Sequence, residues 1–348
     1  MSNLVLRTRI GRRDINRNRE ILILKTIQSR VAILVASLPL CGAPLHVCAQ
    51  TYPIKPIRII VPLAPGGGTD IVGRTIAQKL SESLSQSVIV ENRAGAGGNI
   101  GMEAAAKAPP DGYTVIVTTT GLASNPSLYD KVPFDPIRDF SPVTFLGLGP
   151  FILVVHPSVP ANSVNHLLAL ARSRPGQLNF ASAGNGSGSH LSAELFNSMT
   201  RVQMVNVSYK GGGPALIDLL GGQVSLMFQS MPVALPYVKV GKLRALAVTT
   251  SLRASVAPSI PTISESGVPG FEVVLWYGLF APARTSKEIV AKLNAELNTI
   301  LRTQDVRSRF EVLGIEPVGS TPEELELHLK SEFSKWAKVI KAAGIKAE

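Results

Sequence analysis

After its first fifty residues the chain repeats one pattern, in which a short aliphatic run meets a glycine-rich turn and then an amphipathic stretch. The first instance runs from Ile57 to Val61, through Ala64 to Gly68, into apolar residues at helical spacing between Val72 and Leu84. This pattern predicts a strand, a tight loop and a helix. Thr69 and Asp70 are of the residue types that cap such a helix.

The same unit returns along the rest of the chain, and strands separated by helices are typical of parallel sheets. We therefore expect an α/β protein with mainly parallel sheets. The further predicted strands are Val88–Val90, Thr114–Val117, Ile152–Val155, Leu178–Phe180, Val205–Val207, Ser225–Phe228 and Ala245–Val248. The glycine-rich turns that follow some of them are Gly95–Gly98, Thr118–Gly121, Ser182–Gly188 and Lys210–Gly213.

Two helices are predicted near the C-terminus. Thr285 to Glu288 matches a capping box ahead of an apolar stripe, and Thr321 to Glu324 opens a second such stripe. No disordered linker divides the chain, so we expect two lobes joined by short crossing strands.

The N-terminal segment has the order of a secretory signal peptide. Basic residues from Arg7 to Arg30 precede the apolar run Val31 to Leu40, and Val47-Cys48-Ala49 supplies small residues for cleavage after Ala49. Residues 1–49 are therefore predicted to be removed on export. A retained membrane anchor is the alternative, although the run is short for a bilayer. The leader is long, so a start codon further downstream is also left open.

Charge and cysteine content change the picture once this leader is set apart. The whole chain carries a formal charge of +11, and residues 1–49 contribute eight Lys and Arg against two Asp and Glu. The remaining charges are spread out, and only 5% of residues are aromatic, which argues against nucleic-acid binding. Both cysteines, Cys41 and Cys48, lie in the leader, so the mature chain has no disulfide or thiolate. Neither cysteine is preceded by the small residue that lipidation requires.

The glycine-rich loops are the candidate chemistry. A strand that ends in such a loop and restarts as a helix presents free backbone N–H groups at the positive end of the helix dipole, which suits an anion. For any single loop, a plain tight turn is the alternative. No P-loop or dinucleotide motif is present, and His156, His166, His190 and His328 lack ligand spacing. We expect neither a cofactor nor a metal.

Two further alternatives concern single side chains. A serine hydrolase would use Ser182 or Ser187 with His190 and Asp218, but the sequence lacks the nucleophile elbow of that class. Lys210 either pairs with a ligand carboxylate or is solvated beside its glycines. Asp70 would repel an anion, and a capping role is preferred for it.

Taken together, these motifs resemble the substrate-binding receptors of tripartite tricarboxylate transporters, the Bug proteins of Bordetella and its relatives. The similarity covers essentially the whole mature chain, and its motifs occur in family order. They are Tyr52-Pro53-x-Lys55-Pro56-Ile57-Arg58, Pro65-Gly66-Gly67-Gly68-Thr69-Asp70, Val90-Glu91-Asn92-Arg93-Ala94-Gly95-Ala96-Gly97-Gly98-Asn99-Ile100-Gly101, Asp111-Gly112-Tyr113-Thr114, Ser182-Ala183-Gly184-x-Gly186-Ser187, Tyr209-Lys210-Gly211, Gly221-Gly222-Gln223 and Trp276-x-Gly278-x-Phe280-Ala281-Pro282.

The resemblance implies a type II periplasmic binding-protein fold with a central cleft. It implies lobe 1 from residues 50–152 and 252–348, and lobe 2 from residues 153–251. A periplasmic, monomeric receptor without enzymatic activity is expected, which delivers a small carboxylate to the transporter's membrane subunits. A receptor that signals to a membrane sensor is the alternative. The implied ligand-binding residues are Pro65, Gly66, Gly67, Gly68, Thr118, Thr119, Thr120, Ser182, Ala183, Gly184 and Ser187.

One departure from the family pattern bears on the ligand. Relatives often carry acids in the strand after the Gly-Gly-Gln turn, where this chain has Ser225 and Gln229. An acid there suits a ligand ammonium group. We therefore expect a carboxylate without an amine, such as a dicarboxylate, or a neutral or aromatic acid.

Overall fold

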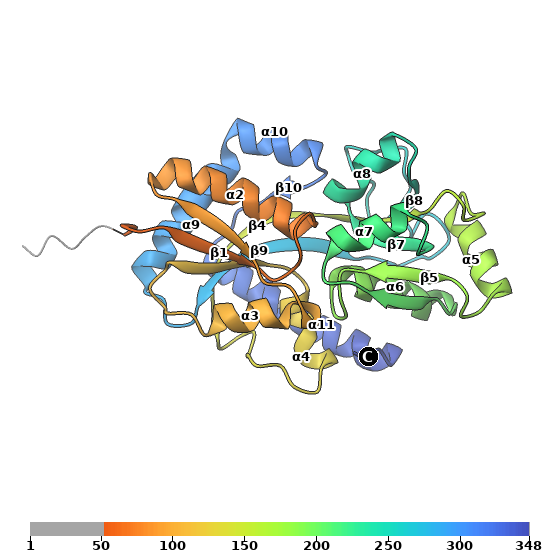
Figure 1. Cartoon of the computed structure of the whole chain (residues 1–348), viewed down its shortest axis with the longest axis horizontal. Helices are drawn as coiled ribbons and strands as arrows, with labels where there is room; N and C mark the ends of the chain where they lie inside the picture. The colour runs from red at the N-terminus through yellow and green to blue at the C-terminus, as the bar shows by residue number, and fades with distance from the viewer. Residues whose placement is uncertain (1–51, 348) are drawn as a thin grey trace, which may run out of the picture. The chain divides into compact units, whose positions relative to one another are not determined.

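The computed structural model describes residues 52–347, which form a mixed α/β fold (Figure 1). The predicted signal peptide lies outside the described residues. The strands are β1 (Ile57–Val61), β2 (Val88–Asn92), β3 (Thr114–Thr118), β4 (Phe140–Val155), β5 (Asn179–Ser182), β6 (Val205–Ser208), β7 (Leu226–Ser230), β8 (Arg244–Val248), β9 (Val274–Pro282) and β10 (Glu316–Pro317). The helices are α2 (Gly68–Leu84), η1 (Ala96–Gly98), α3 (Asn99–Ala106), α4 (Gly121–Leu128), α5 (Val164–Ser173), α6 (Gly188–Thr200), α7 (Gly212–Leu220), α8 (Met231–Lys239), α9 (Lys287–Arg302), α10 (Gln304–Val312) and α11 (Pro322–Ala343).

Two sheets share the long strand β4. The first sheet has the order β2-β1-β3-β9-β4, with β10 also on β4, and the second has the order β4-β7-β5-β6, with β8 also on β4. The outer strands β1, β2 and β3, and likewise β5, β6 and β7, pair in parallel, as the sequence predicts. Strand β9 is antiparallel to both β3 and β4, because it returns from the second sheet and enters the first in the opposite direction.

Strand β4 carries the chain from one lobe to the other. It pairs with β9 as far as Pro150 and with β7 from Phe151 onward. Residues 252–273, which the sequence assigns to lobe 1, include Phe271, whose ring centroid lies 6.2 Å from that of Phe196 and 6.3 Å from that of Phe228. Part of this segment therefore packs on the second sheet, because its aromatic side chain completes that sheet's core.

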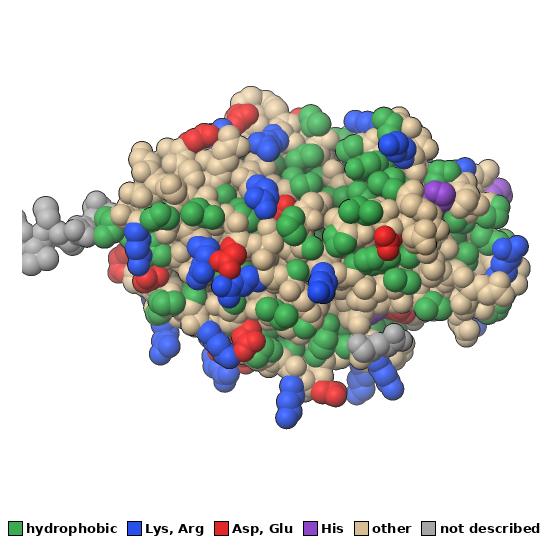
Figure 2. Space-filling model, viewed as in Figure 1, with side chains coloured by type: hydrophobic (Ala, Val, Ile, Leu, Met, Phe, Trp, Pro, Cys, Tyr) green, Lys and Arg blue, Asp and Glu red, His purple; other side chains and the backbone are tan. Residues whose placement is uncertain are grey.

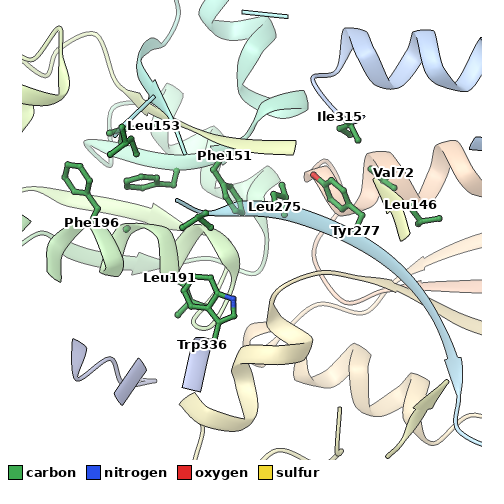
Figure 3. Packing of buried hydrophobic residues seen from close by; sticks show 14 of the residues in the cluster. Val72, Leu146, Phe151, Leu153, Leu191, Phe196, Leu275, Tyr277, Ile315 and Trp336 are labelled. Atoms are coloured by element: carbon green, nitrogen blue, oxygen red, sulfur yellow. The ribbon is translucent and has the colours of Figure 1, made fainter. Parts of the chain in front are cut away.

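The core is continuous through the crossing strands. Strand β1 buries side chains on both faces: Ile57 and Ile59 join a cluster that extends through Phe151 to the second sheet, whereas Ile60 joins a separate cluster. Burial on both faces is what a parallel strand covered by helices requires. Figure 3 shows Phe151, Leu275 and Tyr277 along the crossing strands, between the core residues of the two sheets.

The helix starts refine the capping predictions. Gly67, and not Thr69 or Asp70, is the N-cap residue of α2. Helix α9 begins one residue later than the predicted capping box, with the Ser286 side chain accepting a hydrogen bond from the backbone N–H of Ile289. The predicted capping box of Thr321 and Glu324 is confirmed at α11.

Two features of the molecule as a whole complete the description. Within residues 52–347, no helix combines the length and apolar character needed to cross a membrane. On the face seen in Figure 2, Lys and Arg side chains are scattered and interspersed with Asp and Glu, without a continuous basic stripe.

Candidate functional site

Three helices begin at one small cavity between the lobes. Helix α2 comes from the first lobe, and α6 and α7 come from the second; their N-cap residues are Gly67, Ser187 and Gly211. Gly67 and Gly211 offer no side-chain cap, so first-turn N–H groups of α2 and α7 remain free for another acceptor. The cavity is lined by the first turns of all three helices. Such an arrangement concentrates positive potential without using a charged side chain.

The cavity is small in this structure. It encloses about 40 Å³, whereas one water molecule needs on the order of 10–15 Å³ by the same kind of measure. A ligand of several carbon atoms therefore needs the lobes to move apart.

Direct hydrogen bonds join the lobes around the cavity. The backbone N–H of Ala64 donates to the carbonyl of Lys210 (2.9 Å), the Ser124 hydroxyl donates to the carbonyl of Gly186 (2.7 Å), and the Tyr129 hydroxyl donates to the carbonyl of Asn185 (3.1 Å). The acceptors are backbone carbonyls of lobe 2 in all three cases. Lobe 2 therefore contributes only backbone atoms to these three contacts, so its part in them does not depend on which side chains it carries.

Glycines permit this approach of backbone to backbone. A β-carbon on Gly213 would lie 2.3 Å from the carbonyl oxygen of Pro65, whereas one on Gly67 would make only ordinary contact, 3.5 Å from the amide nitrogen of Gly212. The glycine at position 213 is therefore required by the closed geometry, since any side chain there would collide with the backbone of lobe 1.

Asp70 is the acidic side chain that lines the cavity, and its negative charge is already paired. It is buried, and its carboxylate accepts hydrogen bonds from the backbone N–H of Gly66 (3.0 Å), from Arg74 (3.0 Å) and from Asn92 (2.9 Å). Burial opposes its ionisation, but these hydrogen bonds outweigh burial and hold the pKa of Asp70 below its usual value. Asp70 thus orders the loop before α2, as part of a capping network and not as the N-cap itself.

The predicted binding residues divide into two groups. Five line the cavity: Gly67, Gly68, Thr119, Ala183 and Ser187. The others flank it, with Pro65 and Gly66 exposed and with Thr118, Thr120, Ser182 and Gly184 buried nearby in the same loops. Within the described part of the chain, the hydroxyls of Thr118, Thr119, Thr120 and Ser182 are buried without a hydrogen-bond partner.

His190 stabilises the lobe 2 loop that precedes α6. It is 3% exposed, and its Nδ1 accepts a hydrogen bond from the backbone N–H of Gly186 (3.2 Å). Burial lowers the pKa of His190 to about 4, so the ring is neutral at neutral pH. The side chain therefore fixes the loop that carries Ser187.

Comparison with known families decides which class this site belongs to. The model of the tripartite tricarboxylate transporter family receptor matches residues 72–345. The chain belongs to this receptor family.

Individual receptors are similar over nearly their whole length. Protein BugT of Bordetella pertussis is 38% identical over 318 residues, which cover 91% of this chain and 98% of BugT. Rpa4515 of R. palustris, solved with adipate, is 40% identical with a TM-score of 0.83, over 85% of this chain and 99% of that one. MatC of Rhodopseudomonas palustris, solved with bound malate, is 36% identical with a TM-score of 0.80, over 83% of this chain and 100% of that one. The two-lobe solute-binding fold expected from the sequence is thereby confirmed.

Three residues of the alternative hydrolase triad, Ser187, His190 and Asp218, form hydrogen bonds with other groups in this receptor fold. Among residues 52–347, the Asp218 carboxylate accepts its side-chain hydrogen bond from the Tyr209 hydroxyl (2.6 Å), and His190 Nδ1 is taken by a backbone N–H. The Ser187 hydroxyl accepts from the backbone N–H of His190, as the cap of α6. No hydrogen bond in this part of the structure links the three as a triad.

Several cavity residues were not predicted from the sequence. Phe151, Gln229, Ser230, Leu275 and Tyr277 reach the cavity from the crossing strands and from the end of β7. The only sequence signals were the Trp-x-Gly motif around Tyr277 and the departure from the family pattern at Gln229.

Lys210 lies outside the cavity. Its exposed side chain borders a second, wider hollow of about 340 Å³ at the lobe interface and forms no ion pair within residues 52–347. The sequence left two interpretations of the Lys210 side chain open, and this placement agrees with the one in which it is solvated.

Proposed function

We propose that this receptor captures a small dicarboxylate without an amino group, by closing its lobes, and delivers it to the membrane subunits of a tripartite tricarboxylate transporter. The observation that carries the proposal is the convergence of free helix N-termini from both lobes on one cavity. A carboxylate bound there would accept hydrogen bonds from both lobes at once, and would therefore stabilise the closed state.

Among residues 52–347, no unpaired acid lines the cavity, which supports a ligand without an ammonium group. Gln229 occupies the end of β7, where its amide nitrogen donates to the carbonyl of Gly212 (2.9 Å) and its amide oxygen accepts from the backbone N–H of Ser230 (2.8 Å). Asp70 is satisfied by Arg74 and its other donors. A buried ammonium ion would find no free negative partner, and burying an unpaired charge is costly.

The relatives support the same ligand class. Rpa4515 was solved with adipate and MatC with malate, which are dicarboxylates of different length and neither of which carries an amine. We therefore propose dicarboxylates without an amine as the ligand class of this chain, and we propose neither adipate nor malate in particular.

The remaining assignments belong to the same proposal. The eleven residues implied by the family motifs would form or frame the site, joined by Gln229, Ser230 and Tyr277. The first lobe would comprise residues 50–152 and the C-terminal part of the chain, and the second residues 153–251, extended through residues 252–273. The protein would act in the periplasm as a monomer, after removal of residues 1–49, and would bind its ligand without converting it.

A thermal-shift and calorimetric ligand panel tests the proposal. Succinate, malate and adipate are compared with aspartate and glutamate on the purified mature chain. We expect at least one simple dicarboxylate to raise the melting temperature, since a ligand at 100 times its Kd adds about 2.7 kcal/mol to stability. Mass spectrometry before and after incubation should show the ligand unchanged.

Gln229→Glu is the matched variant, because it places a carboxylate at the cavity without changing side-chain length. It should weaken dicarboxylate binding by like-charge repulsion. Stabilisation of the wild-type chain by aspartate or glutamate, but by none of the simple dicarboxylates, would falsify the proposal.

A further inference from the structure

The Tyr277 hydroxyl is a buried polar group at the cavity. Tyr277 is 0% exposed and lines the cavity from β9. Among the described residues, no group meets its hydroxyl at full hydrogen-bonding geometry, although the Ser230 hydroxyl lies beside it. A buried hydroxyl left unpaired destabilises the folded chain, so a group of this kind at a binding cavity points to a partner that arrives with the ligand.

The hydroxyl lies at the free start of α2. A β-carbon added to Gly68 would lie 2.5 Å from the Tyr277 oxygen and 2.7 Å from the Ser230 hydroxyl oxygen. Gly68 is the first residue of α2, whose N-cap offers no side-chain acceptor. The phenol and the first-turn N–H groups of α2 therefore border the same space at the floor of the cavity.

The groups around this space are mainly donors. Burial raises the pKa of the Tyr277 phenol by more than the adjacent Ser230 hydroxyl lowers it, so the phenol remains a neutral O–H at physiological pH. The nearby Ser230 hydroxyl donates to the Gln229 amide oxygen (3.3 Å), and that same oxygen accepts from the backbone N–H of Ser230. An acceptor-only group on the ligand, such as a carboxylate, satisfies both the phenol and the first-turn N–H groups of α2, whereas an ammonium group would face those N–H groups as one donor against another.

We propose that Tyr277 is a specificity-determining residue whose hydroxyl donates to the innermost carboxylate oxygen of the ligand, in concert with the first turn of α2. The assignment rests on the proposed dicarboxylate function and sharpens it. It gives β9, a crossing strand, a direct part in recognition, and it makes the floor of the cavity selective for a carboxylate over an amine or a primary amide.

Tyr277→Phe tests this assignment, with Tyr237→Phe as the matched control. Tyr237 is a half-buried tyrosine on α8, outside the residues that line the cavity. Each variant is titrated calorimetrically with succinate, malate and adipate, and its melting temperature is measured without ligand.

Tyr277→Phe should weaken binding of the preferred dicarboxylate by about tenfold or more, because a hydrogen bond to a charged group is lost. Its melting temperature without ligand should stay equal or rise, because the substitution removes an unpaired buried hydroxyl. A merely structural role for the hydroxyl would lower this temperature instead. Tyr237→Phe should bind like the wild type.

Gly68→Ala provides a second test should Tyr277→Phe fail to fold. Its methyl group would lie 2.5 Å from the Tyr277 oxygen, so it should displace that hydroxyl and cause a loss of affinity of similar size. Wild-type affinity in either variant overturns the Tyr277 assignment while leaving the dicarboxylate function standing. A wild-type chain that binds none of the three dicarboxylates overturns the function itself, and this assignment with it.

Discussion

At the scale of single residues, one buried imidazole links solution pH to the binding loop. His190 accepts a hydrogen bond from Gly186 through a ring nitrogen that must be unprotonated, and burial keeps it so. Protonation would remove the acceptor and place a positive charge in a buried site. The lobe 2 loop before α6 therefore depends on the neutral form of this ring.

Acid pH should weaken the fold through His190. Its pKa in the folded chain is about 4, below the ordinary value of 6.5, so the unfolded chain binds the proton more tightly. The contribution is fully present above pH 6.5 and is lost as pH falls from about 6.5 to about 4, reaching about 3 kcal/mol.

Urea denaturation at several pH values measures this contribution. His190→Gln should flatten the dependence of the unfolding free energy on pH between 4 and 6.5. The control His166→Gln changes an exposed residue on α5 and should keep the wild-type slope. An equal slope in wild type and His190→Gln would contradict the role given to this residue.

At the scale of elements, the start of α7 is shaped for contact with the other lobe. Gly212 and Gly213 open the helix, although glycine is a weak helix former. The compensation is close approach: a β-carbon at position 213 would meet the backbone of Pro65. The two glycines thus lower the local helix propensity of α7, but they allow the lobes to pack closely.

Gly213→Ala should separate helix stability from closure. Alanine favours the helix by up to about 1 kcal/mol, so the ligand-free protein should be as stable as the wild type or more so. Dicarboxylate affinity should fall by about tenfold or more, because the lobes cannot meet fully. Calorimetry and thermal unfolding check both effects.

Gly221→Ala is the control for this change. Gly221 lies at the other end of α7, where an added β-carbon would meet nothing closer than 3.5 Å. This variant should bind normally. Normal binding by Gly213→Ala would show that the contact with Pro65 is not needed for ligand capture.

At the scale of the whole molecule, the lobes meet through few direct hydrogen bonds around a cavity too small for a ligand of several carbons. Capture therefore requires opening, and a ligand that binds both lobes should shift the population toward closure. Small-angle scattering of the mature chain should show a smaller radius of gyration with saturating dicarboxylate than without it. Gly213→Ala should show a smaller change. An unchanged radius in the wild type would contradict closure as the capture step.

The sequence was most informative where structure is local. The runs Ile57–Val61 and Thr114–Val117 form β1 and most of β3, because alternation with helices marks buried parallel strands. The Thr321 capping box was equally readable, since its signal spans four residues. The same periodicity missed the first half of β4, where Pro142 and Pro150 interrupt the pattern of a strand.

The sequence by itself determined the fold class, the family and the positions of the glycine-rich loops, because each of these is carried by contiguous motifs. Only the tertiary structure decided what lies between those loops. Gln229 and Tyr277 lie outside the glycine-rich loops of the cavity, and they reach the cavity because β7 and β9 meet β4 there. The pairing of Asp70 with Arg74 and Asn92, and the unpaired Tyr277 hydroxyl, likewise depend on contacts made only when the chain is folded.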